Sequence, residues 1–359
     1  MANLFFRTNV TPYRVDTYNA LHEVLGCKLY FMSRDDYSQN YKLEKIESRC
    51  RFEQEILSKG KIFGFPYYKH IWKILKENKP RIVIVPEFKV ITLQALAYKY
   101  LVDRKVKVIS MCDDSYDMVA NGNDFTRTHT LARKLVSPFL DDLLLVDDKV
   151  CKWYRQHYGK GIWMPIIRDE KIEIPLYEKA QAISRKFESE FNLKDKKVLI
   201  FVGRLAEEKN LPTLIEAIGQ TKEEFTTVII GDGPMKDELL EKSKQISKEI
   251  IFPGRYDDDE IRAWFNLGDV FILPSTTEAF GAVTNEALLG GCFALISNAC
   301  GSTCLIDDKN GATFDPHSTK EISELIDNSF KKIPNDNEKT GNKMNLTFDD
   351  SVVNVIKKL

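Results

Sequence analysis

Short apolar runs alternate with amphipathic stretches along the first half of the chain. The apolar runs are bounded by polar or turn residues, as buried strands are, and the stretches between them have the apolar spacing of helices. This rhythm predicts βαβ units around a parallel sheet. The predicted strands cover residues 4–6, 28–32, 82–85, 106–110 and 143–146, and the predicted helices cover 15–25, 67–76, 92–101, 126–136 and 149–158.

A second series of the same kind follows a break in the pattern. Residues 165–175 are Pro-bounded and charge-rich, which predicts a linker, and a helical pattern follows over 177–191. We therefore predict an α/β chain of two tandem Rossmann-like domains facing a central cleft. The second series has predicted strands at 198–202, 227–230, 250–252, 270–273 and 293–296, and predicted helices at 211–218, 235–246, 257–265, 281–289 and 320–330.

The predicted domains are residues 1–170 and 171–340, and residues 341–359 form a separate C-terminal segment. Residues 334–345 are polar and predict a loop, whereas 348–359 regain helical spacing. This last segment is either a frayed tail or a helix that packs back on the body of the protein.

The composition agrees with a two-domain protein and argues against some partners. A chain of 359 residues is about twice the usual domain size, and a net charge of −1 gives no reason to expect nucleic acid. Seven cysteines, Cys300 and Cys304 among them, lack paired spacing, and no secretory signal opens the chain. These features favour a reduced, cytoplasmic protein. No apolar run is long enough to cross a bilayer, although the protein can still rest on one.

The most informative stretch runs from Ser275 to Gly291 and follows the predicted strand 270–273. In an open α/β sheet, ligands bind in the loops after the carboxyl ends of strands. Gly281, after Phe280, lets a ligand approach the backbone closely. Glu278 and Glu286 flank this backbone and can face one pocket. The alternative is that both glutamates are solvated surface charges.

A second loop follows the predicted strand 198–202. Gly203 allows a tight turn there, and Arg204 and Lys209 project from the loop. Parallel strands would bring these cations to the same sheet edge as Glu278, where they can neutralise a diphosphate. The alternative is that they are surface charges paired with neighbouring glutamates.

Two other polar stretches are better explained as structural. Residues 231–234, which include Gly233, read as a turn before a helix, with backbone contact to a ligand as the alternative. Three aspartates at 257–259 are typical of a helix start rather than of a metal site. Since no His or Cys cluster has ligand spacing, we predict no obligatory metal.

With these motifs in place, the second domain resembles the GT-B glycosyltransferases of family 4, which are retaining and use sugar nucleotides. The resemblance covers about 198–316. It is carried by Gly203-Arg204-x4-Lys209-Asn210, Gly231-x-Gly233-Pro234, Pro274-Ser275-x2-Glu278-x-Phe280-Gly281, Glu278-x7-Glu286 and Asn310-Gly311.

The resemblance implies a role for each matching residue. Arg204 and Lys209 would bind the donor diphosphate, Glu286 the ribose hydroxyls, and Glu278 hydroxyls of the transferred sugar. The backbone of Phe280 and Gly281 would lie near the diphosphate. Gly203 and Gly233 would also contact the donor. No metal or other cofactor is implied, because fixed cations stabilise the departing diphosphate.

The first domain matches the family less well. Its first loop contains Arg14 but lacks the double glycine of many relatives. Where many relatives have a His after the strand 106–110, this chain has Asp113 and Asp114. Arg14, Asp113 and Asp114 are candidates for the acceptor side, and the aspartates are equally well explained as turn carboxylates.

Residues 59–81 mix cations with aromatic side chains. This mixture suits contact with an anionic bilayer and a lipid-linked acceptor, whereas the alternative places the aromatics in the core.

The resulting expectation is a retaining glycosyltransferase of surface polysaccharide assembly (capsule, O-antigen or exopolysaccharide). It would move a sugar from a nucleoside-diphosphate sugar to a glycan acceptor, either free or lipid-linked. The enzyme would be cytoplasmic, with peripheral contact at the inner face of the cell membrane left open. Alternatives are a sugar-nucleotide epimerase or phosphorylase of similar fold and an inactive, transferase-like binding subunit.

Overall fold

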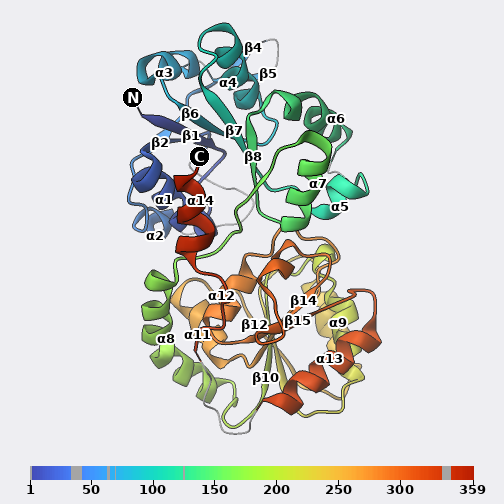
Figure 1. Ribbon diagram of the computed structural model, residues 1–359. Helices are drawn as coiled ribbons and strands as arrows, with labels where there is room; N and C mark the ends of the chain where they lie inside the picture. Colours follow the sequence, from blue (N-terminus) through green and yellow to red (C-terminus); the bar gives the residue numbers. More distant parts are fainter. Residues whose placement is uncertain (1, 34–42, 63–64, 69, 124–125, 334–340) are drawn as a thin grey trace. The chain divides into compact units, whose positions relative to one another are not determined.

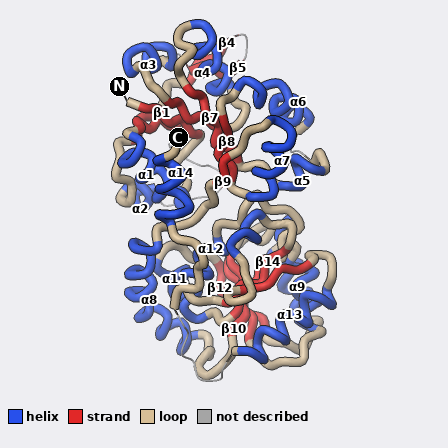
Figure 2. The backbone as a smooth tube through the Cα atoms, in the orientation of Figure 1, coloured by secondary structure: helices blue, strands red, loops and turns tan. Residues whose placement is uncertain are grey.

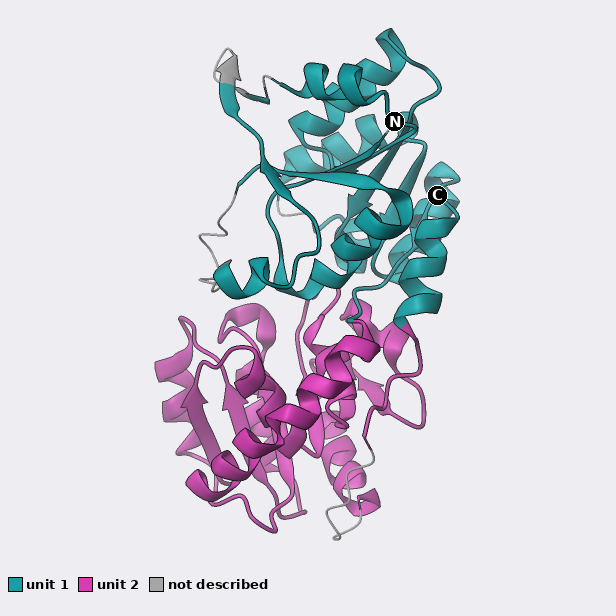
Figure 3. Cartoon of the chain, turned by 90° about the vertical axis from the view of Figure 1, so that its left-hand side faces the viewer, with its two compact units in different colours: residues 1–168, 348–359 teal, residues 169–347 magenta. Residues whose placement is uncertain are grey.

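The computed structural model describes residues 2–33, 43–62, 65–68, 70–123, 126–333 and 341–359. The chain divides into two compact units (Figures 1 and 3). Unit 1 comprises residues 1–168 and 348–359, and unit 2 comprises residues 169–347. Each unit contains a parallel sheet with helices (Figure 2), as the alternating pattern predicts.

The described part of unit 1 is built on a seven-stranded sheet in the order β3-β2-β1-β6-β7-β8-β9. Every neighbouring pair of strands is parallel, and the order reverses between β1 and β6. A separate antiparallel hairpin joins β4 to β5. The strands are β1 (Asn3–Arg7), β2 (Cys27–Phe31), β3 (Gln54–Ile56), β4 (Lys59–Ile62), β5 (Phe65–Tyr68), β6 (Ile82–Pro86), β7 (Lys107–Cys112), β8 (Asp142–Leu145) and β9 (Ile162–Trp163).

Some helices of unit 1 begin at a residue whose side chain caps them. The side chain of Asp147 caps α7 by accepting from the backbone N–H of Lys149 at 2.8 Å, and Gly159 ends that helix with φ 68°. The helical segments are η1 (Pro12–Arg14), α1 (Val15–Leu25), α2 (Leu43–Glu47), α3 (Ile71–Asn78), α4 (Val90–Leu101), α5 (Tyr116–Ala120), α6 (Arg127–Val136), η2 (Ser137–Phe139) and α7 (Asp148–Tyr158).

The predicted helix 67–76 is partly wrong. Its first residues belong to β5, which pairs Tyr68 with Lys59 of β4, and α3 begins only at Ile71. Aromatic residues favour extended, pleated backbone, so this hairpin outcompetes the start of the helix. The short strands β3 and β9 were not predicted, because two or three residues carry too little periodicity.

Unit 2 is built on a six-stranded parallel sheet in the order β12-β11-β10-β13-β14-β15. Its strands are β10 (Val198–Val202), β11 (Thr226–Ile230), β12 (Ile250–Gly254), β13 (Val270–Leu273), β14 (Phe293–Ser297) and β15 (Gly311–Phe314). Its helical segments are α8 (Glu170–Glu190), η3 (Glu207–Lys209), α9 (Leu211–Gly219), α10 (Lys236–Ser243), α11 (Asp259–Leu267), α12 (Val283–Leu289), η4 (Gly301–Leu305) and α13 (Thr319–Lys332).

The predicted linker 165–175 is half wrong, because α8 already begins at Glu170. Asp169 caps the helix, and Pro175 lies inside it. A proline removes one helical hydrogen bond. Packing compensates, since α8 lies against α11 and its Glu173 pairs with the buried Arg262 at 2.8 Å.

The last residues of the chain return to unit 1. A π-helical turn (η5, Asp349–Val353) leads into α14 (Asn354–Lys357), and both lie against α1. Val352 and Ile356 are fully buried there. Lys107 of β7 donates a hydrogen bond to the carbonyl oxygen of Leu359 at 3.1 Å. The C-terminal helix therefore completes the first unit rather than the second (Figure 3).

Candidate functional site

The sheet of unit 2 has one natural ligand-binding edge. Strands β10 and β13 are parallel neighbours, and the strand order reverses between them. Ligands of open α/β sheets bind at the carboxyl ends of strands at such a reversal. The loops that leave β10 and β13 there are residues 203–210 and 274–282, which are the two loops that the sequence singles out.

An ion pair joins these two loops. The ammonium group of Lys209 contacts the carboxylate of Glu278, and the side chains are only 17% and 20% exposed, respectively. The backbone N–H of Thr276 also donates to the carbonyl oxygen of Glu208 at 3.0 Å. The structure thus brings Lys209 and Glu278 together at the reversal point, as the parallel arrangement predicts.

Arg204 lies on the same loop but is more exposed to solvent. Its side chain is 63% exposed and bonds the carboxylate of Glu208 at 2.8 Å. Partial burial opposes ionisation of Glu208, but the hydrogen bond from Arg204, a backbone hydrogen bond and the charges of Arg204 and Lys209 together outweigh it and lower the pKa of that carboxyl. Without a ligand, Arg204 therefore makes the surface pair that the sequence allowed as an alternative.

The glycines of this edge let two loops pack closely. A Cβ on Gly231 would lie 1.8 Å from the carbonyl oxygen of Gly203, and one on Gly233 would lie 2.4 Å from that of Leu205. The backbone N–H of Leu205 donates to the carbonyl oxygen of Asp232 at 2.9 Å. This packing by itself accounts for glycine at 231 and 233.

Close contacts and backbone hydrogen bonds fix the course of the loop after β13. Gly281 has φ 88°, and a Cβ there would lie 2.7 Å from the side chain of Leu273. Phe280 is buried, and its carbonyl oxygen accepts from the N–H of Ser302 at 2.7 Å. The carbonyl oxygen of Glu278 accepts from Gly301 at 3.2 Å. The loop therefore holds the Glu278 side chain on a fixed backbone.

Glu286 lies on α12, which begins at Val283 rather than at the predicted 281. Its side chain is half-buried. The hydroxyl of Tyr177, from α8, donates to the backbone carbonyl oxygen of Glu286 at 2.7 Å. This hydrogen bond fixes the position of α12 relative to α8.

Unit 1 has a charged cluster at its own strand-order reversal. The carboxylate of Asp113 bridges the guanidinium groups of Arg7 and Arg14, and Arg7 also donates to the carbonyl oxygen of Met111 at 2.9 Å. Burial tends to raise the pKa of Asp113, but the two arginines hold it below its ordinary value. Glu87 lies 3.9 Å from Arg7, and burial raises its pKa despite that attraction.

Asp114, the neighbouring candidate, points into unit 1. It is 2% exposed and accepts hydrogen bonds from the hydroxyl of Tyr154 at 2.6 Å and from Nε of Arg133 at 2.9 Å. These contacts explain an aspartate here as a structural residue.

Comparison with known proteins identifies the region that carries the first of these sites. Residues 183–344 match the protein family described as glycosyl transferases group 1. The chain contains a glycosyl transferases group 1 domain. That domain includes the loops after β10 and β13, so the family match and the candidate donor site coincide.

Solved structures of this class share the fold over the whole chain. The Anabaena protein HepE, solved with UDP and glucose, has a TM-score of 0.74 at 15% identity and covers 100% of this chain and 98% of its own. WaaG, a glycosyltransferase involved in lipopolysaccharide biosynthesis, gives a TM-score of 0.60 at 15% identity, covering 99% of this chain and 94% of its own. The predicted GT-B fold is confirmed.

Curated relatives match only in part. The putative teichuronic acid biosynthesis glycosyltransferase TuaC of Bacillus subtilis is 29% identical over 37% of this chain and 32% of its own length. The alpha-monoglucosyldiacylglycerol synthase of Acholeplasma laidlawii is 34% identical over 33% and 32%, respectively. The chain thus spans about a third of the length of these relatives. Together with the family match, they support a transferase.

Sequence reasoning missed part of the charged cluster in unit 1. Arg7 ends β1 and Glu87 directly follows β6, so both lie at carboxyl ends of central strands. A charged residue that ends a fully apolar run was the available signal. It was not used, because no motif accompanies it.

The remaining candidates carry no site. Among the described residues, no group of three or more His, Cys, Asp or Glu side chains has the arrangement to hold a metal ion. Cys300 is buried, Cys304 is half-buried, and neither forms a disulfide. Within the described ranges, no helix combines the length and apolarity that crossing a membrane requires.

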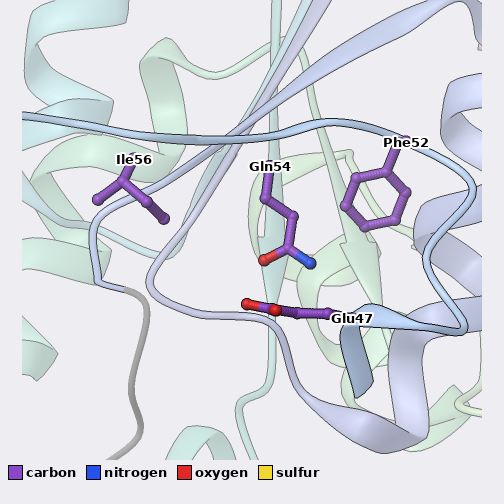
Figure 4. A pocket seen from close by; sticks show the side chains of 4 residues that line it. All are labelled: Glu47, Phe52, Gln54 and Ile56. Atoms are coloured by element: carbon purple, nitrogen blue, oxygen red, sulfur yellow. The ribbon is translucent and has the colours of Figure 1, made fainter. Parts of the chain in front are cut away.

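A hollow at the edge strand β3 is lined by Glu47, Phe52, Gln54 and Ile56 (Figure 4). In the close-up, the amide of Gln54 and the carboxylate of Glu47 face one another across it. Its described lining residues include no cation and no second acid, so their chemistry does not match that of the donor edge.

Proposed function

We propose that this chain is a retaining glycosyltransferase that moves a sugar from a nucleoside-diphosphate sugar to a glycan acceptor. The observation that carries the proposal is the Lys209–Glu278 pair at the strand-order reversal of unit 2, inside the region that matches the family. A diphosphate needs fixed cations, and a sugar needs a carboxylate that accepts hydrogen bonds from its hydroxyls. Both groups are present at one sheet edge.

Donor binding would exchange partners within this pair. A diphosphate carries more negative charge than the single carboxylate of Glu278 and offers several oxygens to an ammonium group, so it can take over Lys209. Glu278 would then be released to accept hydrogen bonds from the sugar. Glu286 would do the same for the ribose, and the backbone of Phe280 and Gly281, with that of Gly203 and Gly233, would lie near the diphosphate.

The chemical step breaks the bond between the anomeric carbon and the diphosphate oxygen. The electron pair of that bond goes to the diphosphate, whose growing charge Arg204 and Lys209 would stabilise. Because these cations are built into the chain, we propose that turnover requires no metal. The acceptor hydroxyl oxygen forms the new bond to the anomeric carbon with retention of anomeric configuration, and its proton passes to an oxygen of the departing diphosphate.

The acceptor side is proposed for unit 1. Asp113 lies at the carboxyl edge of its sheet, is 27% exposed and is held in place by the buried Arg7 and Arg14, so its carboxylate would accept hydrogen bonds from glycan hydroxyls. The names of relatives in teichuronic acid and glycolipid synthesis support surface polysaccharide assembly with a lipid-linked acceptor. Such a reaction would take place in the cytoplasm, at the inner face of the membrane.

The test is donor turnover by the purified full chain. Candidate UDP- and GDP-sugars are incubated without acceptor, and the products are separated. Slow release of free sugar and nucleoside diphosphate from one donor is expected. Conversion of the donor into an epimeric sugar nucleotide would favour an epimerase, and no change in any donor would favour an inactive binding subunit.

A further inference from the structure

Exposed apolar side chains are concentrated on one face of unit 1. Ten large hydrophobic residues are exposed among those that the structure describes, and six of them line a single groove of about 650 Å³. None of the ten lies in unit 2. A contiguous apolar patch of this kind marks an interaction surface. The six are Leu93, Tyr100, Leu101, Leu131, Leu135 and Phe139.

The groove exists because α4 is apolar on two faces. Its inner face buries Ile91, Ala95 and Tyr98 in the core of unit 1, whereas Leu93 and Leu101 project outward with 51% and 78% exposure, respectively. A helix that is apolar all round is normally buried on every side. The outer face of α4 therefore exposes apolar side chains that a second apolar surface can cover.

The wall opposite α4 is built by residues of α6 and η2. Leu131 and Leu135 are one helical turn apart on α6 and are 57% and 60% exposed. The ring of Phe139 packs edge-on against that of Tyr100 with centroids 6.1 Å apart, and the Tyr100 hydroxyl donates to the Phe139 carbonyl oxygen at 3.2 Å. A tyrosine with an apolar body and a polar tip suits a boundary between water and lipid.

Charge distinguishes between the possible occupants of this groove. Neither α4 nor α6 contains an Asp or Glu. Arg127 and Lys134 are exposed on α6, and Arg104 and Lys105 are exposed just after α4. Of the acids nearby, Asp141 is engaged by Lys99, and the half-buried Asp103 accepts a hydrogen bond from the backbone N–H of Lys105. Apolar side chains flanked by cations match a bilayer that offers acyl chains beneath anionic headgroups.

We propose that this groove, with its flanking cations, docks unit 1 onto an anionic lipid bilayer. The inference rests on the proposed function only for the place of action, since a lipid-linked acceptor lies in such a bilayer. It also places the proposed bilayer contact on a different surface from the predicted residues 59–81. In residues 59–81, Tyr68 is buried and Trp72 packs edge-on against Tyr98, so these two aromatics belong to the core.

The test is flotation of the full chain with vesicles of phosphatidylcholine alone or mixed with phosphatidylglycerol. We expect binding to the mixed vesicles that weakens with salt. The variant Leu131→Glu/Leu135→Glu should lower the partition coefficient at least about tenfold. Arg127→Ala/Lys134→Ala should lower it about fivefold for each cation removed.

Matched controls keep the test specific. Val24→Glu/Ile56→Glu changes two exposed apolar residues of unit 1 outside the groove, and Lys320→Ala/Lys331→Ala removes two exposed cations of unit 2. Both should float like the unaltered chain. Circular dichroism and thermal unfolding verify that every variant is folded.

Three results would overturn the inference. They are absence of binding to mixed vesicles, equal loss in the control variants, and a dimer in sedimentation that only the groove variant dissociates. Donor turnover is measured on the same preparations. A chain that turns over donor but ignores vesicles refutes this inference alone, and one that binds vesicles without turnover refutes the proposed function alone.

Discussion

Individual residues at the donor edge are fixed by close contacts more than by charge. The loops after β10 and β11 approach until their backbones touch, which only glycine at 231 and 233 allows. Lys209 and Glu278 then meet because these loops and the loop after β13 have fixed courses. Changes to the glycines should therefore affect folding, whereas changes to the ionic groups should affect ligand binding.

Gly231→Ala should destabilise unit 2 strongly. Gly254 provides the matched control, since it also has a positive φ, 97° against 148°, but has nothing within 4 Å of a built Cβ. Gly254→Ala introduces only backbone strain, whereas Gly231→Ala also introduces a steric clash with the backbone of Gly203. Gly231→Ala should therefore lower the free energy of unfolding by about 2 kcal/mol more than Gly254→Ala does. Urea unfolding measures both. Equal losses would show that the loops can separate without cost.

Asp147 should make stability depend on pH. Burial raises its pKa from 3.8 to about 6 in the folded chain. The folded state then holds more protons than the unfolded state between these values, so stability falls as pH rises through that window. Asp147→Asn keeps the helix cap but cannot ionise.

The unaltered chain should lose stability between pH values of about 4 and 6, whereas Asp147→Asn should not. The unfolding free energy of the variant minus that of the unaltered chain should therefore rise over this range and stay constant above it. Denaturant unfolding at several pH values measures this difference. A difference that does not change with pH would contradict the raised pKa.

At the scale of elements, long periodic segments were predicted well and short or interrupted ones were not. Strands β10 and β13 have the predicted bounds, and so does helix α1. Helix α8 was cut short in the prediction because Pro175 signals a break, yet packing against α11 outweighs the missing hydrogen bond. Local patterns cannot report such tertiary compensation.

The candidate site, too, could be predicted only in part. The loops after β10 and β13 could be predicted, because parallel strands bring their carboxyl ends to one edge. The pairing of Lys209 with Glu278 could not, since it depends on loop courses that no periodicity encodes. Arg7 was missed for a similar reason, because its partner Asp113 is far away in the sequence.

The buried Glu173–Arg262 pair should be a principal support of α8. The two side chains are 2% and 9% exposed and 2.8 Å apart. Glu173→Gln leaves the guanidinium of Arg262 without that charge partner in a buried place, which should cost about 3 kcal/mol of unfolding free energy. Glu178→Gln, on the exposed side of the same helix, should cost almost nothing. Thermal unfolding distinguishes them, and similar melting temperatures would contradict a structural role for the pair.

At the scale of the whole molecule, the two units carry different proposed roles. Unit 2 carries the residues proposed for the sugar nucleotide, and unit 1 carries the charged cluster proposed for the acceptor and the apolar groove. The C-terminal residues 348–359 complete unit 1, so the chain crosses between the units twice. Folding of unit 1 therefore requires the far end of the chain.

Turnover should be insensitive to metal chelation. The account assigns neutralisation of the departing diphosphate to Arg204 and Lys209, which need no added ion. With the donor that the chain accepts, excess EDTA should leave kcat/KM unchanged within about twofold, a margin well below the loss from removing one catalytic donor. A loss restored by Mg²⁺ or Mn²⁺ would contradict this assignment.

The central claim is that Lys209 and Glu278 form half of a sugar-nucleotide site, and calorimetric titration of the full chain with its donor tests it most directly. Lys209→Ala should weaken donor binding about tenfold to a hundredfold, because it removes a charge-assisted contact to the diphosphate. Lys196→Ala, which removes a cation paired with Glu249 elsewhere on unit 2, should bind like the unaltered chain. Equal affinity in the folded Lys209 variant would contradict the account.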